Sequence, residues 1–562
     1  MTILTWTGGP TGNGGSADDP NDWNPAQAPT AGDRLVIDHP LNTISFNSNG
    51  GVTRANSFAT SGNVTFAGGL LADDQLSFGS TNTGTLVVGT GTAQISINGT
   101  LSNTGTIELN PGFQGGSPQV DNLGAPAAGT LALTGGGSVI LQAFSDLGFG
   151  GELINIDNTI SGTGAIGGGE GFLNQGTVTM AGSIGTFDNR NLIDATGYTG
   201  IGSPGPYTNS GTLEATGSGT LDVGGAHIDN TGGTIASDGT AFVHIWNGAI
   251  ITGGTLATPD NGTITLVSAT LDGASSPLDN TGYLNLTDQN SLMGAIGNSG
   301  SIQLPFGYTL LNSATVTLSG GGRLLLANSL IVAENAPATL DNVDNTIVGT
   351  GTIGVALIND GAIEAKGGLL VLNNAASGTG ELVVDPGATL ELAAATAQGV
   401  IFNPATLSGG LLVGGTLKLD TAASYTGTIA GFGPADTIYL ADVNPISVTS
   451  ALFSGETLVV NIQGGGTLDY AVTGSFASDT LVVAVDAAGG SDIIVYGTTI
   501  DLAAGNNTVT VTDTTLAGGP VTISDGASGN NKISASGDTA ASTGKTLSYS
   551  AGTGTDNFTG GF

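Results

Sequence analysis

The stretch Asn103-Thr104-Gly105-Thr106-Ile107-Glu108-Leu109 decides the fold, because its pattern returns along the chain. Each copy places an Asn-x-Gly turn before a short strand of alternating apolar and polar residues. Further copies begin at Asn174, Asn209, Asn280, Asn298 and Asn359. A turn that recurs with the same strand behind it predicts a chain wound into stacked coils. The fold class is therefore all-β, a right-handed parallel β-helix, or solenoid.

The intervals between the asparagines give the length of one coil. They are 21 residues for Asn82 to Asn103, 18 for Asn280 to Asn298 and 35, close to two coils, for Asn174 to Asn209. A period of roughly 18–21 residues lies within the range of solenoid repeats. Over residues 35–420 we expect about 20 coils, which stack to about 95 Å at the strand spacing of a sheet.

The sequence also contains a longer repeat that spans several coils. Thr130 to Gly137 matches Thr315 to Gly322 at an offset of 185, and Asp157 to Ile160 matches Asp344 to Ile347 at 187. We interpret this as the duplication of a block of many coils.

Alternation along each strand predicts which side chains face the interior. The inward set is Ile107, Leu109, Val178, Met180, Leu213, Ala215, Ile363 and Ala365, and the outward set is Glu108, Thr179, Glu214 and Glu364. Burial of the aliphatic ladders is the expected main source of stability. The asparagines are expected to tolerate left-handed backbone and to hydrogen-bond their counterparts in the coils above and below. The glycine of each Asn-x-Gly turn is expected to supply a positive φ.

The composition excludes several classes of partner. Glycine is 98 of 562 residues without a three-residue period, so collagen is excluded. The 8 basic and 44 acidic residues give a net charge of −36, which argues against nucleic acid and anionic membranes and favours cations such as calcium. No stretch approaches 18 apolar residues, so we expect no membrane insertion.

Composition and cysteine usage also bear on export. The chain has no cysteine, which fits secreted bacterial repeat proteins. Residues 1–6 lack the basic and apolar regions of a signal peptide. We expect either a trimmed chain or an export route that does not read the N-terminus.

Changes in composition and strand pattern divide the chain into four predicted regions. Residues 1–34, with Trp6 and Trp23, are an N-terminal cap, and residues 35–420 are the parallel β-helix. Residues 421–497 are a small all-β module with longer strands. Residues 498–562 are a Thr/Gly/Asn-rich β-repeat segment, with Gly-Asn-Asn marks that begin at Gly505 and Gly529, and this segment enters an RTX-like repeat.

Several segments resemble large bacterial exoproteins of the autotransporter, haemagglutinin and type I-secreted adhesin kind. The segments similar to the entry of their β-helices are Trp6 to Gly9, Asp22 to Asn24 and Pro29 to Asp33. Asp157 to Gly164 followed by Asn174 to Thr177 is similar to their passenger coils, and Phe432 to Leu440 with Gly489 to Ile493 to a short module. The resemblance implies an extracellular or bacterial cell-surface location.

The segment Ala551 to Thr559 resembles one nine-residue calcium-binding repeat of the RTX type, with Ala551 where glycine is usual. The resemblance makes Asp556 a carboxylate ligand of Ca²⁺ and fills its shell with loop carbonyls around Gly552 and Gly554. Because such repeats share each ion between neighbouring turns, one copy implies either a stub of a longer protein or chance. Proteins of this type carry an uncleaved C-terminal export signal.

Acidic clusters are candidate catalytic or metal sites. The pairs are Asp18 with Asp19, Asp73 with Asp74 and Asp341 with Asp344, and the cluster Asp18, Asp19, Asn21 and Asp22 offers oxygen ligands for calcium. Each lies among turn-forming residues, so capping and Asx-turn roles are favoured. No cluster of bases accompanies them, as a lyase of acidic sugars needs. No serine or cysteine nucleophile motif, phosphate loop or zinc spacing is present.

Two histidines and a tryptophan are the remaining candidates. The interval from His227 to His244 is close to one coil, so the two are expected to stack on consecutive coils, with Trp246 on the same face as His244. A sugar-binding platform is one interpretation, since aromatic faces stack on sugar rings. A partly buried His–Trp pair is the favoured one.

Together these observations predict a non-enzymatic extracellular stalk that attaches to cell-surface glycans or matrix, or to itself, with Ca²⁺ as the expected cofactor. A surface-layer or filament subunit is the structural alternative. A β-helical polysaccharide lyase or hydrolase is the enzymatic one.

Overall fold

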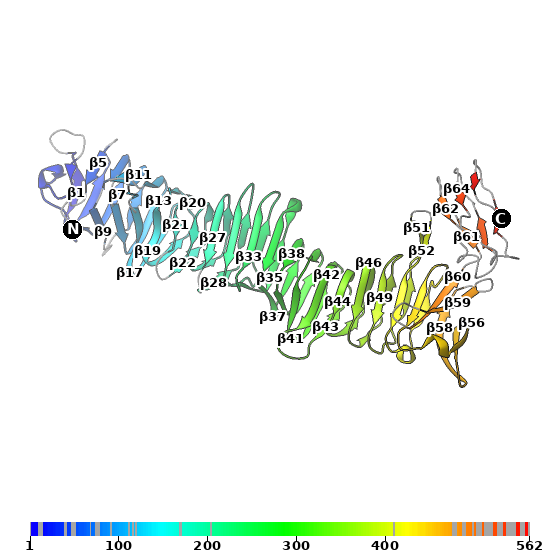
Figure 1. The fold of residues 1–562 in the computed structure, drawn as a ribbon. Coiled ribbons are helices and arrows are strands. Elements are labelled where there is room, and N and C mark those ends of the chain that lie inside the picture. Colours follow the sequence, from blue (N-terminus) through cyan, green and yellow to red (C-terminus); the bar gives the residue numbers. More distant parts are fainter. Residues whose placement is uncertain are drawn as a thin grey trace. The chain divides into compact units, whose positions relative to one another are not determined.

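A computed structural model describes most of the chain. The described residues are 2–8, 15–38, 42–45, 52–67, 69–73, 79–89, 93–110, 113–114, 117–118, 121–167, 171–202, 205–408, 411–474, 480–485, 490–496, 499–501, 508–510, 521–524, 532–534, 547–550 and 557–559. They form two compact units, Met1–Ser291 and Leu292–Phe562. Both are built of stacked parallel strands (Figure 1).

The predicted fold class is confirmed: the chain is all-β and forms a parallel β-solenoid of about 17 turns. The number of turns is slightly below the expected 20, since some coils carry insertions. Thr85 pairs with Thr106 after one coil of ordinary length, whereas Thr106 pairs with Ser138 after a much longer one. The described residues also include the short 3₁₀ turns η1 Pro20–Asp22, η2 Pro259–Asn261, η3 Ala422–Ser424 and η4 Pro445–Ser447. None of the described residues lies in a helix of the length and apolar character needed to cross a bilayer.

Each coil of the Met1–Ser291 unit contributes one strand to each of three faces. The first face contains β1 Ile3–Trp6, β4 Arg34–Ile37, β7 Ser57–Thr60, β10 Ser80–Asn82, β13 Gly99–Asn103, β17 Asp121–Thr134, β19 Ser145–Asn155, β22 Gly171–Asn174, β25 Phe187–Asn189, β28 Pro206–Asn209, β31 His227–Asp229, β34 Ile250–Thr252 and β37 Thr270–Asn280. The second contains β5 Asn42–Ser45, β8 Asn63–Phe66, β11 Thr85–Gly89, β14 Thr106–Asn110, β18 Ser138–Leu141, β20 Thr159–Gly162, β23 Thr177–Met180, β26 Leu192–Ala195, β29 Thr212–Ala215, β32 Thr234–Ser237 and β35 Gly254–Ala257.

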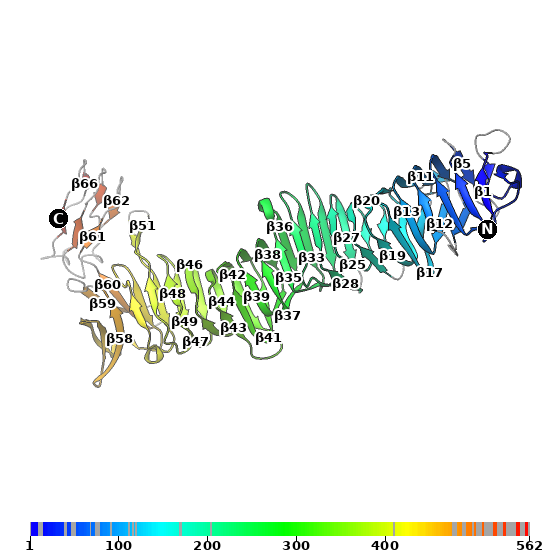
Figure 2. The ribbon, with the colours of Figure 1, turned by 180° about the vertical axis from the view of Figure 1, so that it is seen from behind.

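The third face contains β6 Val52–Ala55, β9 Gly69–Asp73, β12 Ala93–Ile97, β21 Ala165–Ile166, β24 Ser183–Ile184, β27 Tyr198–Gly202, β30 Thr220–Gly224, β33 Phe242–Trp246, β36 Thr263–Val267 and β38 Tyr283–Thr287. The long strands β17 and β19 bend from this face into the first, and β37 runs from the first face into the second. In the view from behind, β27, β33 and β36 follow one another along the unit (Figure 2).

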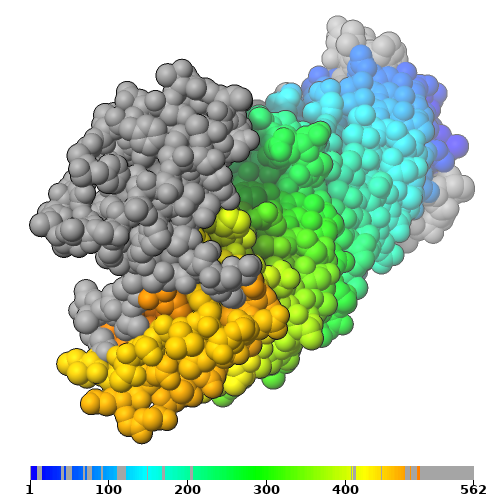
Figure 3. All heavy atoms as spheres, turned by 90° about the vertical axis from the view of Figure 1, so that its right-hand side faces the viewer, coloured from blue at the N-terminus to red at the C-terminus, as the bar shows by residue number. Residues whose placement is uncertain are grey.

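The Leu292–Phe562 unit repeats the plan with longer strands that turn corners. Its coils are built from β40 Ser301–Leu304, β41 Tyr308–Ser319, β42 Arg323–Ala333, β43 Thr339–Asn342, β44 Thr346–Ile353, β45 Ala356–Asn359, β46 Ala362–Leu372, β47 Ala376–Ser377, β48 Glu381–Val384, β49 Thr389–Leu392, β50 Val400–Phe402, β53 Thr416–Leu419, β54 Thr428–Ala430 and β55 Thr437–Leu440. On the face shown in the space-filling view, the atoms of neighbouring coils pack directly against one another (Figure 3).

Parallel pairing continues past residue 420, as β53 pairs with β55 and β50 with β54. Antiparallel strands follow: β56 Val448–Ser454, β57 Thr457–Ile462, β58 Gly466–Thr473, β59 Thr480–Val485 and β60 Ser491–Tyr496. The last described strands pair in parallel again, and Thr508 lies opposite Lys532. The domain boundaries at 34, 420 and 497 stay predictions.

The core consists of the predicted aliphatic ladders. All eight residues assigned to the interior are buried, with exposures of 0–1%. The outward residues Glu108, Thr179, Glu214 and Glu364 are half-buried, because side chains of the adjacent coils flank them. Each fully buried leucine or isoleucine contributes about 1.5–3 kcal/mol relative to an exposed one. The repetition of this term along the stack stabilises the solenoid.

Fully buried asparagines line the corner between the first and second faces. Asn189 Nδ2 donates to Asn209 Oδ1 at 2.7 Å, and Asn209 Nδ2 donates to Asn230 Oδ1 at 2.7 Å. The same Nδ2 of Asn209 donates to the Thr234 carbonyl at 3.2 Å. The predicted bonding between like asparagines is confirmed. The expected left-handed backbone is wrong for these buried asparagines, since they end strands and none of the described asparagines at this corner has a positive φ.

The glycine of the mark has a different role from the one predicted. The φ of Gly105 is not positive, and a Cβ placed there would lie 2.1 Å from the carbonyl oxygen of Gly84 in the adjacent coil. The glycine is therefore required because two backbones approach closely at the corner, rather than because the turn is left-handed.

The long repeat of the sequence is confirmed by matching hydrogen bonds in the two units. Asn103 Nδ2 donates to Asn158 Oδ1 at 3.0 Å, and Asn298 Nδ2 donates to Asn345 Oδ1 at 2.9 Å. Asp157 and Asp344 likewise accept from the backbone N–H groups of two glycines at corresponding positions, at 3.0 and 2.9 Å. The two blocks therefore share a local architecture as well as a sequence.

The first coil is closed by the two predicted tryptophans. Trp6 of β1 pairs with Trp23 of β3 Trp23–Asn24 in an antiparallel bridge, and their ring centroids lie 4.9 Å apart in an edge-to-face arrangement. Both rings are buried, and Trp23 Nε1 donates to the Ala17 carbonyl at 2.9 Å.

We predict a pH-dependent stability from Asp436, whose carboxylate accepts from the N–H groups of Gly415 at 2.8 Å and Gly433 at 2.9 Å. Burial raises the pKa of Asp436 from 3.8 to about 6. Because the folded pKa exceeds the unfolded one, its stabilising contribution is complete below pH 3.8 and is lost as the pH rises through about 6. The wild type should lose about 2 kcal/mol relative to Asp436→Asn between pH 4 and pH 7. Denaturant unfolding at both pH values measures the difference, and parallel profiles would contradict it.

Candidate binding surface

Aromatic and ionisable side chains gather on the third face of the Met1–Ser291 unit. The register of β27, β30 and β33 places Tyr198, Thr220 and Phe242 in one row. Asp222 and His244 share the next outward row, and Trp246 lies two residues beyond His244 on β33. We call Tyr198, Asp222, Phe242, His244 and Trp246 the aromatic surface.

The strand alternation points these side chains outward. Leu221, Val223, Val243 and Ile245 occupy the inward positions of β30 and β33 and are buried. The residues between them therefore face solvent. Tyr198 is 63% exposed, Phe242 54% and Trp246 39%, which is unusual for three large aromatic side chains within three successive strands of one face.

Asp222 lies at the centre of the aromatic surface. Its Oδ2 accepts a hydrogen bond from the Tyr198 hydroxyl at 2.7 Å, and its Oδ1 accepts from Trp246 Nε1. His244 Nδ1 lies 4.0 Å from the same Oδ1. The hydrogen bond to Asp222 raises the pKa of Tyr198, which keeps its hydroxyl protonated as a donor. One carboxylate thus fixes the orientation of two aromatic rings.

Glycines leave room beside these rings. A Cβ at Gly224 would lie 3.0 Å from Trp246 Nε1, so the indole packs over the bare backbone of β30. The outward positions of β27 after Tyr198 are Gly200 and Gly202, which carry no side chain. The imidazole of His244 and the indole are parallel, with an interplanar angle of 5° and centroids 5.8 Å apart.

The structure corrects the prediction for His227. This residue lies on β31 of the first face, where it pairs with Pro206 and Ile250, whereas His244 lies on the third face. The interval between the two histidines is shorter than a coil at this point, so they do not stack. His227 Nε2 lies 3.2 Å from Thr252 Oγ1. Trp246 does share the face of His244, as predicted, and both side chains are on the outside.

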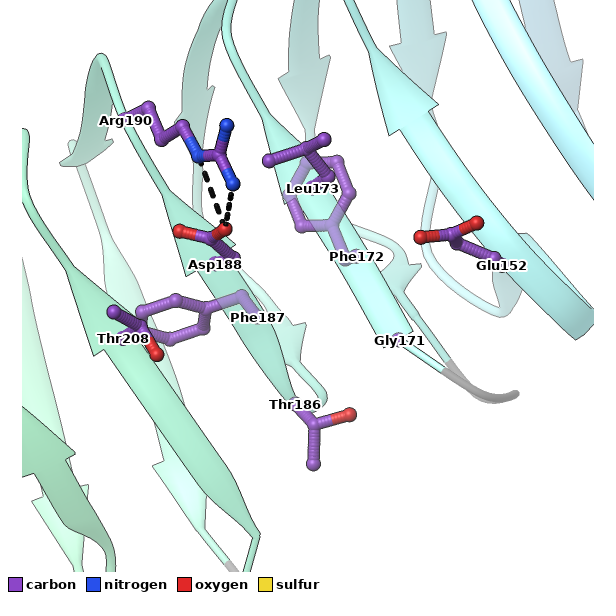
Figure 4. Close-up of a pocket in the computed structure, with 9 residues that line it drawn as sticks. All are labelled: Glu152, Gly171, Phe172, Leu173, Thr186, Phe187, Asp188, Arg190 and Thr208. Carbon is purple, nitrogen blue, oxygen red and sulfur yellow. Dashed lines mark hydrogen bonds and ion pairs between the residues drawn. The ribbon is translucent and has the colours of Figure 1, made fainter.

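A hollow of about 290 Å³ lies on the first face, and Figure 4 shows its lining residues. They are Glu152, Gly171, Phe172, Leu173, Thr186, Phe187, Asp188, Arg190 and Thr208. Arg190 makes an ion pair with Asp188 at 2.7 Å, so the two charges at this edge neutralise each other. Glu152 accepts from the Thr130 hydroxyl at 3.2 Å. With its charged groups engaged in internal contacts, this hollow is the weaker candidate.

The predicted calcium ligands Gly552, Gly554 and Asp556 lie outside the described residues, and the calcium site stays a prediction. Within the described part of the chain, no three His, Asp or Glu side chains are grouped to hold a metal ion. In the cap, Asp19 accepts from the Asn21 backbone N–H at 2.9 Å and forms an Asx turn. Asp18 accepts from the Thr53 hydroxyl at 3.0 Å.

The acidic pairs weighed as catalytic groups have structural partners where they are described. Asp344 accepts from the Gly321 N–H at 2.9 Å and stabilises a turn. Asp74 and the side chain of Asp73 lie outside the described part of the chain. A stacked pair that the sequence reasoning missed is Asp194 and Glu214, which face each other on β26 and β29. Burial raises the pKa of both, and for Glu214 the charges of Asp194 and Asp238 raise it further.

Tyr198, Asp222 and Phe242 were also missed, although the sequence carried a usable signal. Leu221-Asp222-Val223 and Val243-His244-Ile245 lie about one coil apart and show the same alternation. Aligning them would have placed Asp222 beside His244. The Asn-x-Gly marks did not reveal this, because they label a different corner of the coil.

Comparison with known proteins gives no guide to function, since no family model, curated protein or solved structure matches this chain.

Proposed function

We propose that this protein is an extracellular structural stalk that carries an adhesive surface and attaches to cell-surface or matrix glycans. The observation that carries the proposal is the aromatic surface, since it presents exposed rings on regular strands whose alternate side chains are buried in the core.

The construction of the solenoid supports the proposal of a stalk with an adhesive surface. Apolar ladders and buried asparagines hold each coil to the next, so outward positions are free to vary without cost to the core. Side chains on regular strands are also held more firmly than those on loops, which favours a rigid binding surface. The net charge of −36 keeps such a chain soluble and apart from its copies. The absence of cysteine is compatible with an extracellular location.

Adhesion by the whole chain tests the proposal. Beads coated with the folded protein should be retained in a flow chamber on at least one surface from a panel of neutral glycans, acidic glycans and matrix proteins. We expect at least ten-fold more retained beads than with the heat-unfolded protein at equal coating density. Equal retention of the two coatings on every surface would refute the stalk's adhesive role.

A further inference from the structure

We propose that the aromatic surface binds an uncharged polysaccharide, with Trp246 and Tyr198 as its principal contacts. This inference rests on the proposed function and names the residues and the class of glycan.

The aromatic rings supply the apolar part of the site. Tyrosine and tryptophan combine a large apolar ring with a polar edge, so they suit ligands that carry both apolar and polar groups. Pyranose rings have this character, because their C–H groups form apolar patches between hydroxyls. The contact of Asp222 with Tyr198 and Trp246 orients both rings before a ligand arrives. Preorganisation of this kind reduces the entropy lost on binding.

The polar groups between the rings match the hydroxyls of a sugar. The Asp222 carboxylate has oxygen lone pairs beyond those used by Tyr198 and Trp246. The side chain of His244 is 39% exposed, and its ring nitrogens can donate or accept. A few directional groups beside apolar rings are the usual composition of a small-ligand site.

The spacing along the unit fits a chain ligand. Tyr198 and Trp246 lie two strand spacings apart, roughly 10 Å, and Trp246 is also offset by four residues along the strand, roughly 13 Å. Their backbones are therefore about 16 Å apart, and both side chains extend toward the Asp222 carboxylate between them. A short run of linked pyranose rings spans a comparable length. Because Gly200 and Gly202 carry no side chains, nothing on β27 projects between the ring of Tyr198 and the rest of the surface.

Charge decides between glycan classes. The central group is a carboxylate, and the chain carries a net charge of −36. Uronates and sulfated sugars would be repelled by both the local and the overall charge. The ligand is therefore a neutral glycan.

Affinity electrophoresis of the full chain in gels containing neutral glucan, mannan or xylan tests the inference, with polygalacturonate as the anionic comparison. At least one neutral polysaccharide should retard the wild type. Trp246→Ala should weaken its binding at least ten-fold, and Tyr198→Ala several-fold. Trp246→Phe should be intermediate, since it keeps a ring but loses the Nε1 donor to Asp222. Tyr308→Ala removes a tyrosine of similar exposure, 54%, in the other unit and should bind normally.

Circular dichroism and the unfolding midpoint confirm that each variant is folded. Equal retardation of wild type and Trp246→Ala, with bead adhesion intact, would overturn this site while leaving the stalk function standing. Retardation by polygalacturonate alone would overturn the assignment of a neutral ligand. Self-association that disappears in Trp246→Ala without any glycan binding would also overturn it, because the surface would then bind a second copy.

Discussion

Asn209→Ala is expected to lower the free energy of unfolding by about 3 kcal/mol. The Asn209 side chain accepts from Asn189 and donates to both Asn230 and the Thr234 carbonyl, all within a fully buried corner. Its removal leaves a buried donor and two buried acceptors short of a partner, and each unsatisfied group costs about 1–3 kcal/mol. Asn189 Nδ2 keeps the Thr212 carbonyl at 2.9 Å, which limits the loss. Chemical denaturation followed by circular dichroism measures the change.

Asn191→Ala is the matched control, because Asn191 is exposed and donates only to the Gln175 carbonyl at 3.2 Å among its described side-chain donations. It should change stability by less than about 1 kcal/mol. Asn209→Asp keeps the acceptor toward Asn189 but turns an oxygen toward Asn230 Oδ1, so its loss should at least equal that of Asn209→Ala. Equal stability of Asn209→Ala and Asn191→Ala would show that the buried asparagines are energetically replaceable.

The buried asparagines also show what the sequence can and cannot reveal. Their spacing identified the coils, since strand alternation and a recurring turn are local features that a single sequence displays. The long interval from Asn174 to Asn209 does contain two coils, and Asn189 is the intermediate residue. It escaped the pattern because Arg190-Asn191 follows it in place of x-Gly.

The number of faces was not predictable from these marks. Asn209 and Asn230 precede strands of the second face, whereas Asn280 precedes β38 of the third face, so the Asn-x-Gly turns do not stay at one corner of the coil. The aromatic surface lies on the third face, away from the corner that Asn209 and Asn230 mark.

The residues of the aromatic surface become neighbours only through the register that sets Asp222 opposite His244. The coil that runs from Asp222 to His244 is longer than the coil that runs from Asn174 to Asn189. Because the length of the coils varies along the chain, a site formed by residues from several coils cannot be located from one average period.

Gly105→Ala is expected to destabilise the Met1–Ser291 unit by about 3 kcal/mol, through a mechanism that differs from the usual cost of replacing a turn glycine. Where a positive φ is the reason for glycine, alanine strains only its own residue. At Gly105 the backbone angle suits any residue, and the obstacle is the Gly84 carbonyl, 2.1 Å from the new Cβ, with the Thr83 carbonyl carbon at 2.8 Å. Neither atom can rotate away, since both belong to the backbone of the adjacent coil.

The adjacent coils must therefore separate at this corner, which also stretches the nearby bond from Asn82 Nδ2 to Asn103 Oδ1, 2.8 Å in the native state. Gly32→Ala is the control: its φ is not positive, nothing lies within 4 Å of its Cβ, and its stability should be unchanged or slightly raised. Thermal and denaturant unfolding of both variants measure the effect. If Gly105→Ala proved as stable as Gly32→Ala, the close backbone approach would not be what selects glycine after each asparagine.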